Sequence, residues 1–179
     1  MQISVRVSLL IGIFLAVTFA VVAFTSRDNR KRLRIESDLR SMGAYHVGFD
    51  ENNDPDSVSF VLPVSSPRIA NYKSFKHIDL AGANVTDASI RNIAGLQHVM
   101  AIHLTDCDVT DSHLAVLANV GSLKILRLNG SDVTDDAIPF ISSINDLMSV
   151  DLSGTLVTDD GVARLKERCP GIAVRYEPQ

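Results

Sequence analysis

The stretch from Phe75 to Ile172 decides the fold, because the pattern of IDLAGANVTD at residues 78–87 recurs in it, with substitutions, at a constant spacing. The other copies are IHLTDCDVTD at 102–111, LRLNGSDVTD at 126–135 and VDLSGTLVTD at 150–159, so each copy begins 24 positions after the previous one. A fixed period of this size predicts a stacked array of structural repeats rather than a fold with unrelated elements.

Each copy carries the signals of a strand, a turn and a helix. Ile78 and Leu80 alternate with polar neighbours, as in a short strand with one buried face. Gly82 suits a turn, and Thr86 stands where it can cap a helix whose positive end favours the following Asp87. Because one such unit cannot bury its apolar face alone, we expect the copies to share one core.

These residues resemble the leucine-rich repeat family. The segment Val99-x-x-Ile102-x-Leu104-x-x-Cys107-x-Val109 is similar to the family pattern L-x-x-L-x-L-x-x-N/C-x-L. The resemblance implies an α/β fold, a right-handed β-α superhelix of four regular repeats with its strands on the concave side. The ninth position suggests the cysteine-containing subtype, also found in F-box-type substrate adaptors; its residues are Ala83, Cys107, Ser131 and Thr155.

The beginning of the chain predicts a membrane anchor. Residues 7–24 form an uncharged apolar run whose length is near the lower limit for a helix that spans a bilayer. A signal peptide cleaved near Val21-Val22-Ala23 is the alternative. The excess of basic residues after the run places the repeats on the cytoplasmic side, the alternative being a secreted or periplasmic domain. These basic residues are Arg27, Arg30, Lys31, Arg32 and Arg34, against Arg6 before the run.

Charge is distributed unevenly along the chain. Residues 1–43 carry a net charge of +4, and the remaining residues carry −8. The basic segment beside the apolar run is suited to anionic lipid headgroups. The acidic remainder argues against a nucleic-acid partner, because phosphates require a basic surface. This arrangement is similar to that of small bacterial membrane-anchored leucine-rich repeat proteins.

A cap is predicted before the first regular repeat. A helical pattern ends near Gly43, and two alternating segments around the turn at residues 50–56 predict a hairpin. We align Phe60 and Leu62 of its second strand with Ile78 and Leu80 of the first repeat. The expected parts are the anchor (1–26), a basic juxtamembrane helix (27–43), the cap with a degenerate repeat (44–75), and the repeat domain with its C-terminal cap (76–179).

The sequence contains no motif typical of an enzyme, a cofactor site or a metal site. Cys107 is interpreted as a small buried residue. The column of aspartates after the Val-Thr pairs has two interpretations, which are helix-start chemistry and calcium binding, and the first explains all the copies. These aspartates are Asp87, Asp111, Asp135 and Asp159.

A binding surface is predicted at the outward positions of the strands, since Ile78, Leu80 and their equivalents take the inward positions. Opposite charges there can pair across strands, or the face can bind a partner, as the concave sheets of repeat proteins usually do. Arg127 is the expected anchor, and His103 beside Asp79 suggests pH-sensitive binding near neutrality. The candidate residues are His77, Asp79, His103, Arg127, Asn129 and Asp151.

The expected function is non-catalytic protein-protein interaction near a membrane. A soluble exported binding protein, a structural spacer without a specific ligand, and an adaptor similar to F-box proteins are the alternatives. An enzyme ranks last, because no nucleophile or pocket is evident in the sequence.

Overall fold

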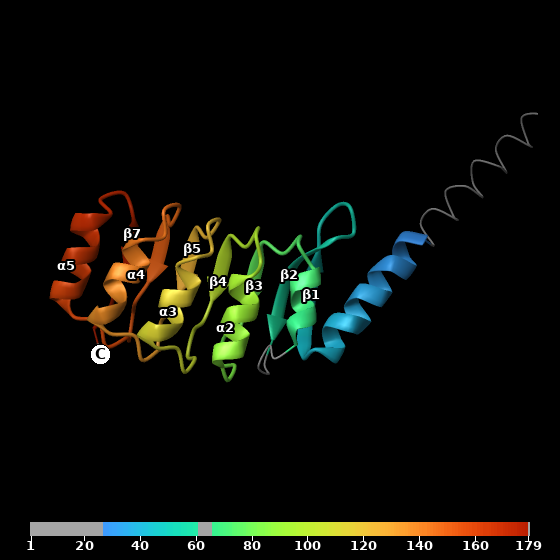
Figure 1. The fold of residues 1–179 in the computed structure, drawn as a ribbon, viewed down its shortest axis with the longest axis horizontal. Helices are drawn as coiled ribbons and strands as arrows, with labels where there is room; N and C mark the ends of the chain where they lie inside the picture. The colour runs from blue at the N-terminus through green and yellow to red at the C-terminus, as the bar shows by residue number, and fades with distance from the viewer. Residues whose placement is uncertain (1–26, 61–65, 179) are drawn as a thin grey trace, which may run out of the picture. The chain divides into compact units, whose positions relative to one another are not determined.

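The computed structural model describes residues 27–60 and 66–178 of the 179-residue chain (Figure 1). The chain divides into two units, residues 1–37 and 38–179. The apolar run at residues 7–24, predicted to be a membrane anchor, lies outside the described residues. Within the described ranges, no helix has the length and apolar character needed to cross a membrane.

In the first unit, residues 27–37 are helical, and the second unit begins with the helical residues 38–41. The strands are β1 (Ala44–Phe49), β2 (Pro55–Phe60), β3 (His77–Asp79), β4 (Ala101–His103), β5 (Ile125–Arg127), β6 (Ser149–Asp151) and β7 (Ala173–Arg175). The helical elements between them are η1 (Pro67–Asn71), α2 (Asp87–Ala94), α3 (Asp111–Leu117), η2 (Asp135–Ala137), α4 (Ile138–Ser142) and α5 (Asp159–Arg168).

The strands of the second unit form one sheet in chain order, from β1 to β7. β1 and β2 form the predicted antiparallel hairpin, and all later neighbours are parallel. From β3 to β7 each residue pairs with its equivalent one repeat later, for example His77 with Ala101 and Ser149 with Ala173. The helices lie in a row beside the strands (Figure 1). The predicted α/β fold, with parallel strands and helices as in leucine-rich repeat solenoids, is therefore confirmed.

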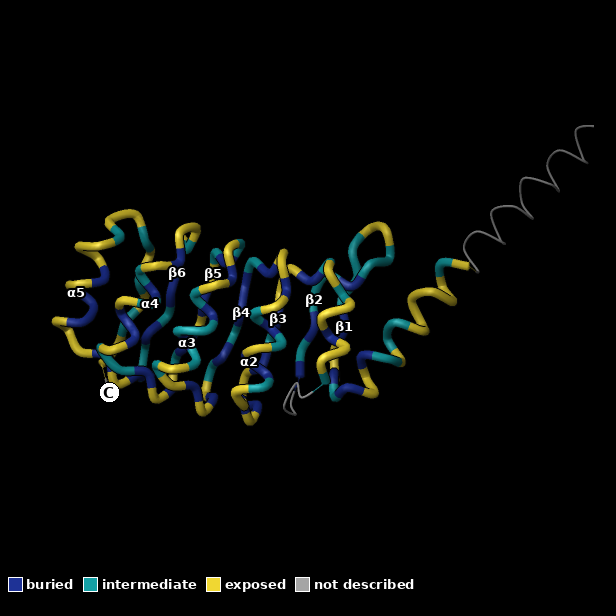
Figure 2. Tube along the Cα trace, in the orientation of Figure 1, coloured by how far each residue is buried: buried dark blue, intermediate teal, exposed yellow. Residues whose placement is uncertain are grey.

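Buried residues occur on both the strands and the helices (Figure 2), and their side chains form the core. Leu80, Leu104, Leu128 and Leu152 each follow the same strand position and are buried. Their backbones also join neighbouring repeats, since the amide of Leu128 donates to the carbonyl of Asp151 at 2.9 Å. The predicted burial of Leu104 and Leu128 is confirmed, and stacked repeats share one apolar layer.

The alignment predicted for the strand that precedes the repeats is wrong by two residues, which is one period of the strand pattern. Val58, rather than Phe60, pairs with Ile78. The antiparallel hairpin determines this register, because Val58 also pairs with Val47 and both are buried. Alternating apolar residues look the same after a shift of two positions, so the pattern alone does not distinguish the two alignments.

The last helical turn before Gly43 belongs to the cap. Leu39 and Met42 are buried, and Gly43 ends the helix with a φ of 99°. The Asp38 carboxylate accepts hydrogen bonds from Arg68 at 2.9 Å and from the Tyr72 hydroxyl at 2.5 Å. Burial and the hydrogen bond to Asp38 raise the pKa of Tyr72 to about 12. These contacts fix the helix end against η1.

The predicted helix starts are confirmed at all four threonines, since Thr86, Thr110, Thr134 and Thr158 are the N-caps of α2, α3, η2 and α5. The aspartates do more than was predicted, because each of two carboxylates binds the threonine of the next repeat. Asp111 accepts from the amide and hydroxyl of Thr134 at 2.8 and 2.7 Å. Asp135 accepts from the same groups of Thr158 at 2.8 Å each. We call each pair a threonine–aspartate clamp.

The first clamp position is different, because His113 lies between the two partners. The Thr110 amide donates to His113 Nδ1 at 3.2 Å, and His113 Nε2 lies 3.0 Å from Asp87 Oδ1. Because Nδ1 accepts this hydrogen bond, the ring hydrogen lies on Nε2, which donates to Asp87. The described residues contain no group of three or more potential metal-ligating side chains.

We expect Thr134→Ala to lower the free energy of unfolding by about 1–2 kcal/mol. The hydroxyl accepts from the amide of Asp136 and donates to Asp111, so alanine removes a helix cap and half of a clamp. Urea unfolding of Thr134→Ala and Thr134→Ser measures the effect. Serine keeps the hydroxyl, so equal stability of the two variants contradicts the clamp.

Candidate functional site on the strand face

The outward strand positions form one row of side chains across the repeats. Strand pairing places Asp79, His103, Arg127 and Asp151 side by side, and it adds Arg175 of β7. Neighbouring strands lie about 4.8 Å apart, so adjacent members of the row are within reach of one another. We call this row, with the outward residues flanking it, the strand face.

The two aspartates of the row have structural partners. Asp79 Oδ1 accepts from the amide of Ala81 at 3.0 Å, and Asp151 Oδ1 accepts from the amide of Ser153 at 3.1 Å. These bonds brace the turn that follows each strand. Asp151 Oδ2 also lies 3.9 Å from Arg175 Nε. Both carboxylates are therefore already engaged within the chain.

The arginines of the row are less constrained. Arg127 is exposed, and its guanidinium has no hydrogen bond or ion pair with the part of the chain that the structure describes. The Arg175 side chain is 71% exposed, and its ion pairs with described residues are long, 3.9 Å to Asp151 and 3.7 Å to Glu177. Exposed ion pairs of this kind contribute little stability, so both guanidinium groups are available for an external partner.

His103 is half-buried between the charged members of the row. Burial lowers its pKa, the positive charge of Arg127 lowers it further, and the opposing effect of Asp79 is smaller. His103 is therefore neutral at neutral pH. The predicted pH sensitivity near neutrality, attributed to Asp79, is corrected: any titration of His103 lies on the acidic side of its ordinary range.

A hollow of about 460 Å³ lies at the strands β5, β6 and β7, within the size range of small binding sites. It brings together Arg127, Asn129 and Asp151, three of the predicted residues. His77, Asp79 and His103 do not line it. Its other lining residues are Thr105, Ile125, Ser149 and Arg175.

Sequence reasoning missed Arg175, although the signal was present. Arg175 follows Asp151 by the same step that separates the other members of the row. The apolar pattern of β7 is weak because Val174 is its one large apolar residue and is only half-buried. Applying the repeat step once more would have placed Arg175 beside Asp151.

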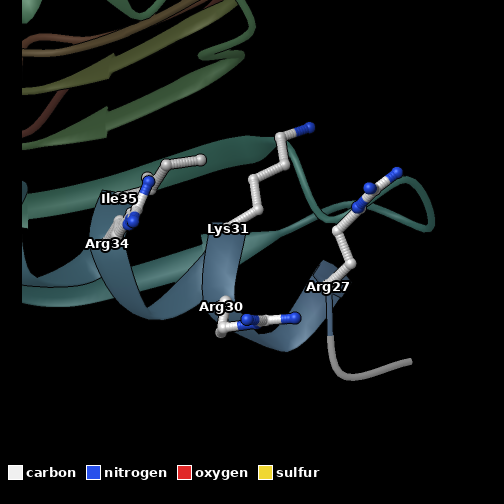
Figure 3. A pocket seen from close by; sticks show the side chains of 5 residues that line it. All are labelled: Arg27, Arg30, Lys31, Arg34 and Ile35. Atoms are coloured by element: carbon white, nitrogen blue, oxygen red, sulfur yellow. The ribbon is translucent and has the colours of Figure 1, made fainter. Parts of the chain in front are cut away.

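A second charged surface lies in the first unit. Arg27, Arg30, Lys31 and Arg34 line a hollow of about 520 Å³ together with Ile35 (Figure 3). Spacings of three and four positions place these side chains on one side of the helix. Arg32, the remaining member between Arg27 and Arg34 of the basic residues named above, does not line this hollow.

The cysteines have structural environments. Cys107 is buried, its Sγ lies 2.9 Å from the carbonyl oxygen of Leu80, and burial raises the pKa of its thiol. Ser131 and Thr155 occupy the same repeat position and donate to the carbonyls of Leu128 and Leu152 at 2.6 and 2.7 Å. The prediction of a small buried residue at Cys107 is confirmed. Cys169 is a half-buried free thiol.

No protein-family model matches this chain, and no curated protein matches it. Among solved structures, an internalin C2 from Listeria monocytogenes is 24% identical, with a TM-score of 0.44, and the match covers 63% of this chain and 56% of that one. An internalin (InlF) from the same organism is 17% identical, with a TM-score of 0.38 and coverage of 62% and 36%.

The structure described as PEPR1-AtPEP1 is 12% identical, with a TM-score of 0.42, and the match covers 75% of this chain and 23% of that one. This chain therefore spans between about a quarter and just over half of the length of these three structures. All three are leucine-rich repeat proteins. Assignment of the fold rests on the constant strand register and the helical row described above.

Proposed function

We propose that this protein is a non-catalytic interaction module that binds a protein partner through its strand face. The observation that carries the proposal is the exposed Arg127, which stands over a hollow without an internal partner among the described residues. Arginine is enriched among the residues that anchor interfaces, and Arg127 lies on a central strand of the face. A face a few strands wide supports a modest interface.

A structural spacer without a specific ligand is the second candidate. The observation that favours it is the engagement of Asp79 and Asp151 in local turns, which explains those residues without a partner. The spacer role does not explain Arg127. An adaptor role and the cysteine-containing repeat subtype are finer proposals, suggested by Cys107 at the ninth repeat position.

Comparative affinity capture from membranes of the native host tests the proposal. Capture with the wild-type chain, Arg127→Ala and the double variant His103→Ala/Arg127→Ala is quantified by mass spectrometry. We expect a partner retained by the wild type to be depleted about tenfold or more with Arg127→Ala, as for an interface hot spot. Arg168→Ala, on the exposed surface of α5, is the control and is expected to retain the partner.

A partner retained equally by every folded variant moves the binding site away from the strand face. Circular dichroism of each purified variant establishes that the fold is intact. This comparison also separates the two candidates, because a spacer has no partner whose retention depends on Arg127.

We further propose that residues 7–24 anchor the chain in a membrane, with the repeats on the cytoplasmic side. The support is the length and apolar character of this run, together with the basic residues that follow it. Four of those basic residues share one hollow on the helix after the run, which is suited to anionic lipid headgroups (Figure 3). Cleavage of the run in an exported protein is the competing proposal.

We expect the full chain to remain in the membrane pellet after carbonate extraction. Protease added to intact spheroplasts is expected to leave the repeats uncut, because a cytoplasmic domain is protected by the membrane. The matched control is a chain without residues 7–24, which is expected in the carbonate supernatant. Removal of the repeats by external protease contradicts the orientation, and a mature N-terminus beyond Ala23 contradicts the anchor.

A further inference from the structure

The hollow at β5, β6 and β7 presents hydrogen-bond donors to a ligand. Arg127 carries only donors, and no described residue occupies them. The Thr105 hydroxyl donates to Asn129 Oδ1 at 2.9 Å, so the acceptor of the Asn129 amide is engaged and its NH₂ group is left to donate. Asn129 follows Arg127 by two positions and therefore lies on the same face. These two donor groups form one side of the hollow.

The charges that line the hollow also favour a ligand that accepts hydrogen bonds. Asp151 is the only acid among the described residues that line it, and Asp151 is held by the amide of Ser153 and approached by Arg175. Beside the hollow, His103 is neutral at neutral pH. Arg127 is therefore the cation without a compensating charge. A ligand that satisfies Arg127 and Asn129 together needs acceptor oxygens and a negative charge, and a carboxylate provides both.

An apolar shelf adjoins the donors. Ile125 lies two positions before Arg127 on the same face and is 39% exposed, although it is a large aliphatic residue. An inorganic anion leaves this side chain without a contact. A carboxylate attached to a methylene stem covers it, and a volume of about 460 Å³ accommodates the side chain with its flanking backbone.

We propose that this hollow binds an aspartate or glutamate side chain in an extended segment of the partner protein. The proposal rests on the function proposed above for the strand face, and it names the chemistry that the partner contributes. The carboxylate accepts from Arg127 and from the Asn129 amide, its stem packs on Ile125, and Arg175 borders the site on the β7 side. Arg127 and Asn129 are the binding residues.

Two synthetic peptides test the proposal directly. One is a short extended peptide with two glutamates flanked by valines, and its twin has glutamines at the same positions. The full chain in zwitterionic detergent is labelled with ¹⁵N, and the arginine side-chain Nε–H signals are followed by NMR during titration. We expect a saturable shift of the Arg127 signal with the glutamate peptide and none with the glutamine twin.

Variants assign the effect to the hollow. Arg127→Gln is expected to weaken binding of the glutamate peptide about tenfold, measured from backbone amide shifts of Ile125 and Ser149. Asn129→Asp places a carboxylate beside the ligand and is expected to abolish binding. Arg168→Gln removes the same charge from α5 and is expected to leave the affinity unchanged.

Equal shifts with both peptides, absence of a saturable shift, or equal weakening by Arg168→Gln and Arg127→Gln overturns the proposal. Failure here is distinguishable from failure of the proposed function. Capture that depends on Arg127 but shows no preference for acidic segments retains the strand face as an interface and removes only the carboxylate.

Discussion

Leu128→Ala is expected to lower the free energy of unfolding by about 2–5 kcal/mol, the largest effect that we predict for a single substitution. Leu128 is 0% exposed and lies in the middle of the stacked core. Alanine leaves a cavity in a repeat that is packed against a neighbouring repeat on each side. The surrounding side chains therefore have little freedom to collapse into the cavity. Urea unfolding of the full chain in detergent gives the difference in free energy.

Ile125→Ala is the matched control, since it removes a similar aliphatic side chain from the same strand region. Ile125 points to the opposite face and is partly exposed, so we expect a loss below about 1 kcal/mol. Equal losses for the two variants contradict the assignment of Leu128 to the inside and of Ile125 to the outside. The comparison therefore tests the strand register as well as the core.

Asp135→Ala is expected to lower the free energy of unfolding by about 2–4 kcal/mol, because it removes a complete threonine–aspartate clamp. The carboxylate accepts from the amide and hydroxyl of Thr158 and from Arg164 at 2.7 Å. Loss of these bonds leaves the Thr158 amide without its partner at the start of α5. Asp136→Ala, which removes the adjacent exposed carboxylate, is the control and is expected to change stability by less than about 1 kcal/mol.

The clamp also predicts a pH dependence. Burial on its own raises the pKa of Asp135, but the hydrogen bonds from Thr158 and the charge of Arg164 outweigh burial and lower the pKa below the ordinary value of 3.8. A carboxyl whose pKa is lower in the folded chain stabilises that chain above its ordinary pKa. This stabilisation is lost as the pH falls through the lowered value.

The difference in stability between the wild type and Asp135→Asn should therefore be constant near neutral pH and should shrink below pH 3.8. Urea unfolding at a series of pH values measures it. A difference that stays the same down to the lowest pH contradicts the role assigned to the ionised carboxylate.

The repeat period was sufficient to predict most of the fold, because each step of the repeat imposes the same strand position on Leu80, Leu104 and Leu128. The threonines were recognised as helix caps for the same reason. The sequence of one repeat does not show which residue of the next repeat a side chain contacts. The hydrogen bonds that Asp111 and Asp135 accept from the threonine of the next repeat could therefore be found only in the structure.

The site was predictable in part. Alternation along the strands correctly placed Arg127 and Asp151 on the outward face, in register with one another. It did not reveal that the turn after β6 holds Asp151, or that Thr105 orients the Asn129 amide. Those are contacts across loops and neighbouring repeats, which depend on the curvature of each turn rather than on residue spacing. The hollow follows from these contacts together with the presence of β7.

Site-specific photo-crosslinking tests most directly whether the strand face is the binding surface. A photoreactive amino acid replaces Ile125 at the edge of the hollow or, as the control, exposed Lys166 on α5. The chains are irradiated in membranes of the native host. We expect a discrete crosslinked product from position 125 that is lost when Arg127→Ala is added, and no such product from position 166. Products that arise only from position 166, or that persist at position 125 without Arg127, contradict binding through the strand face.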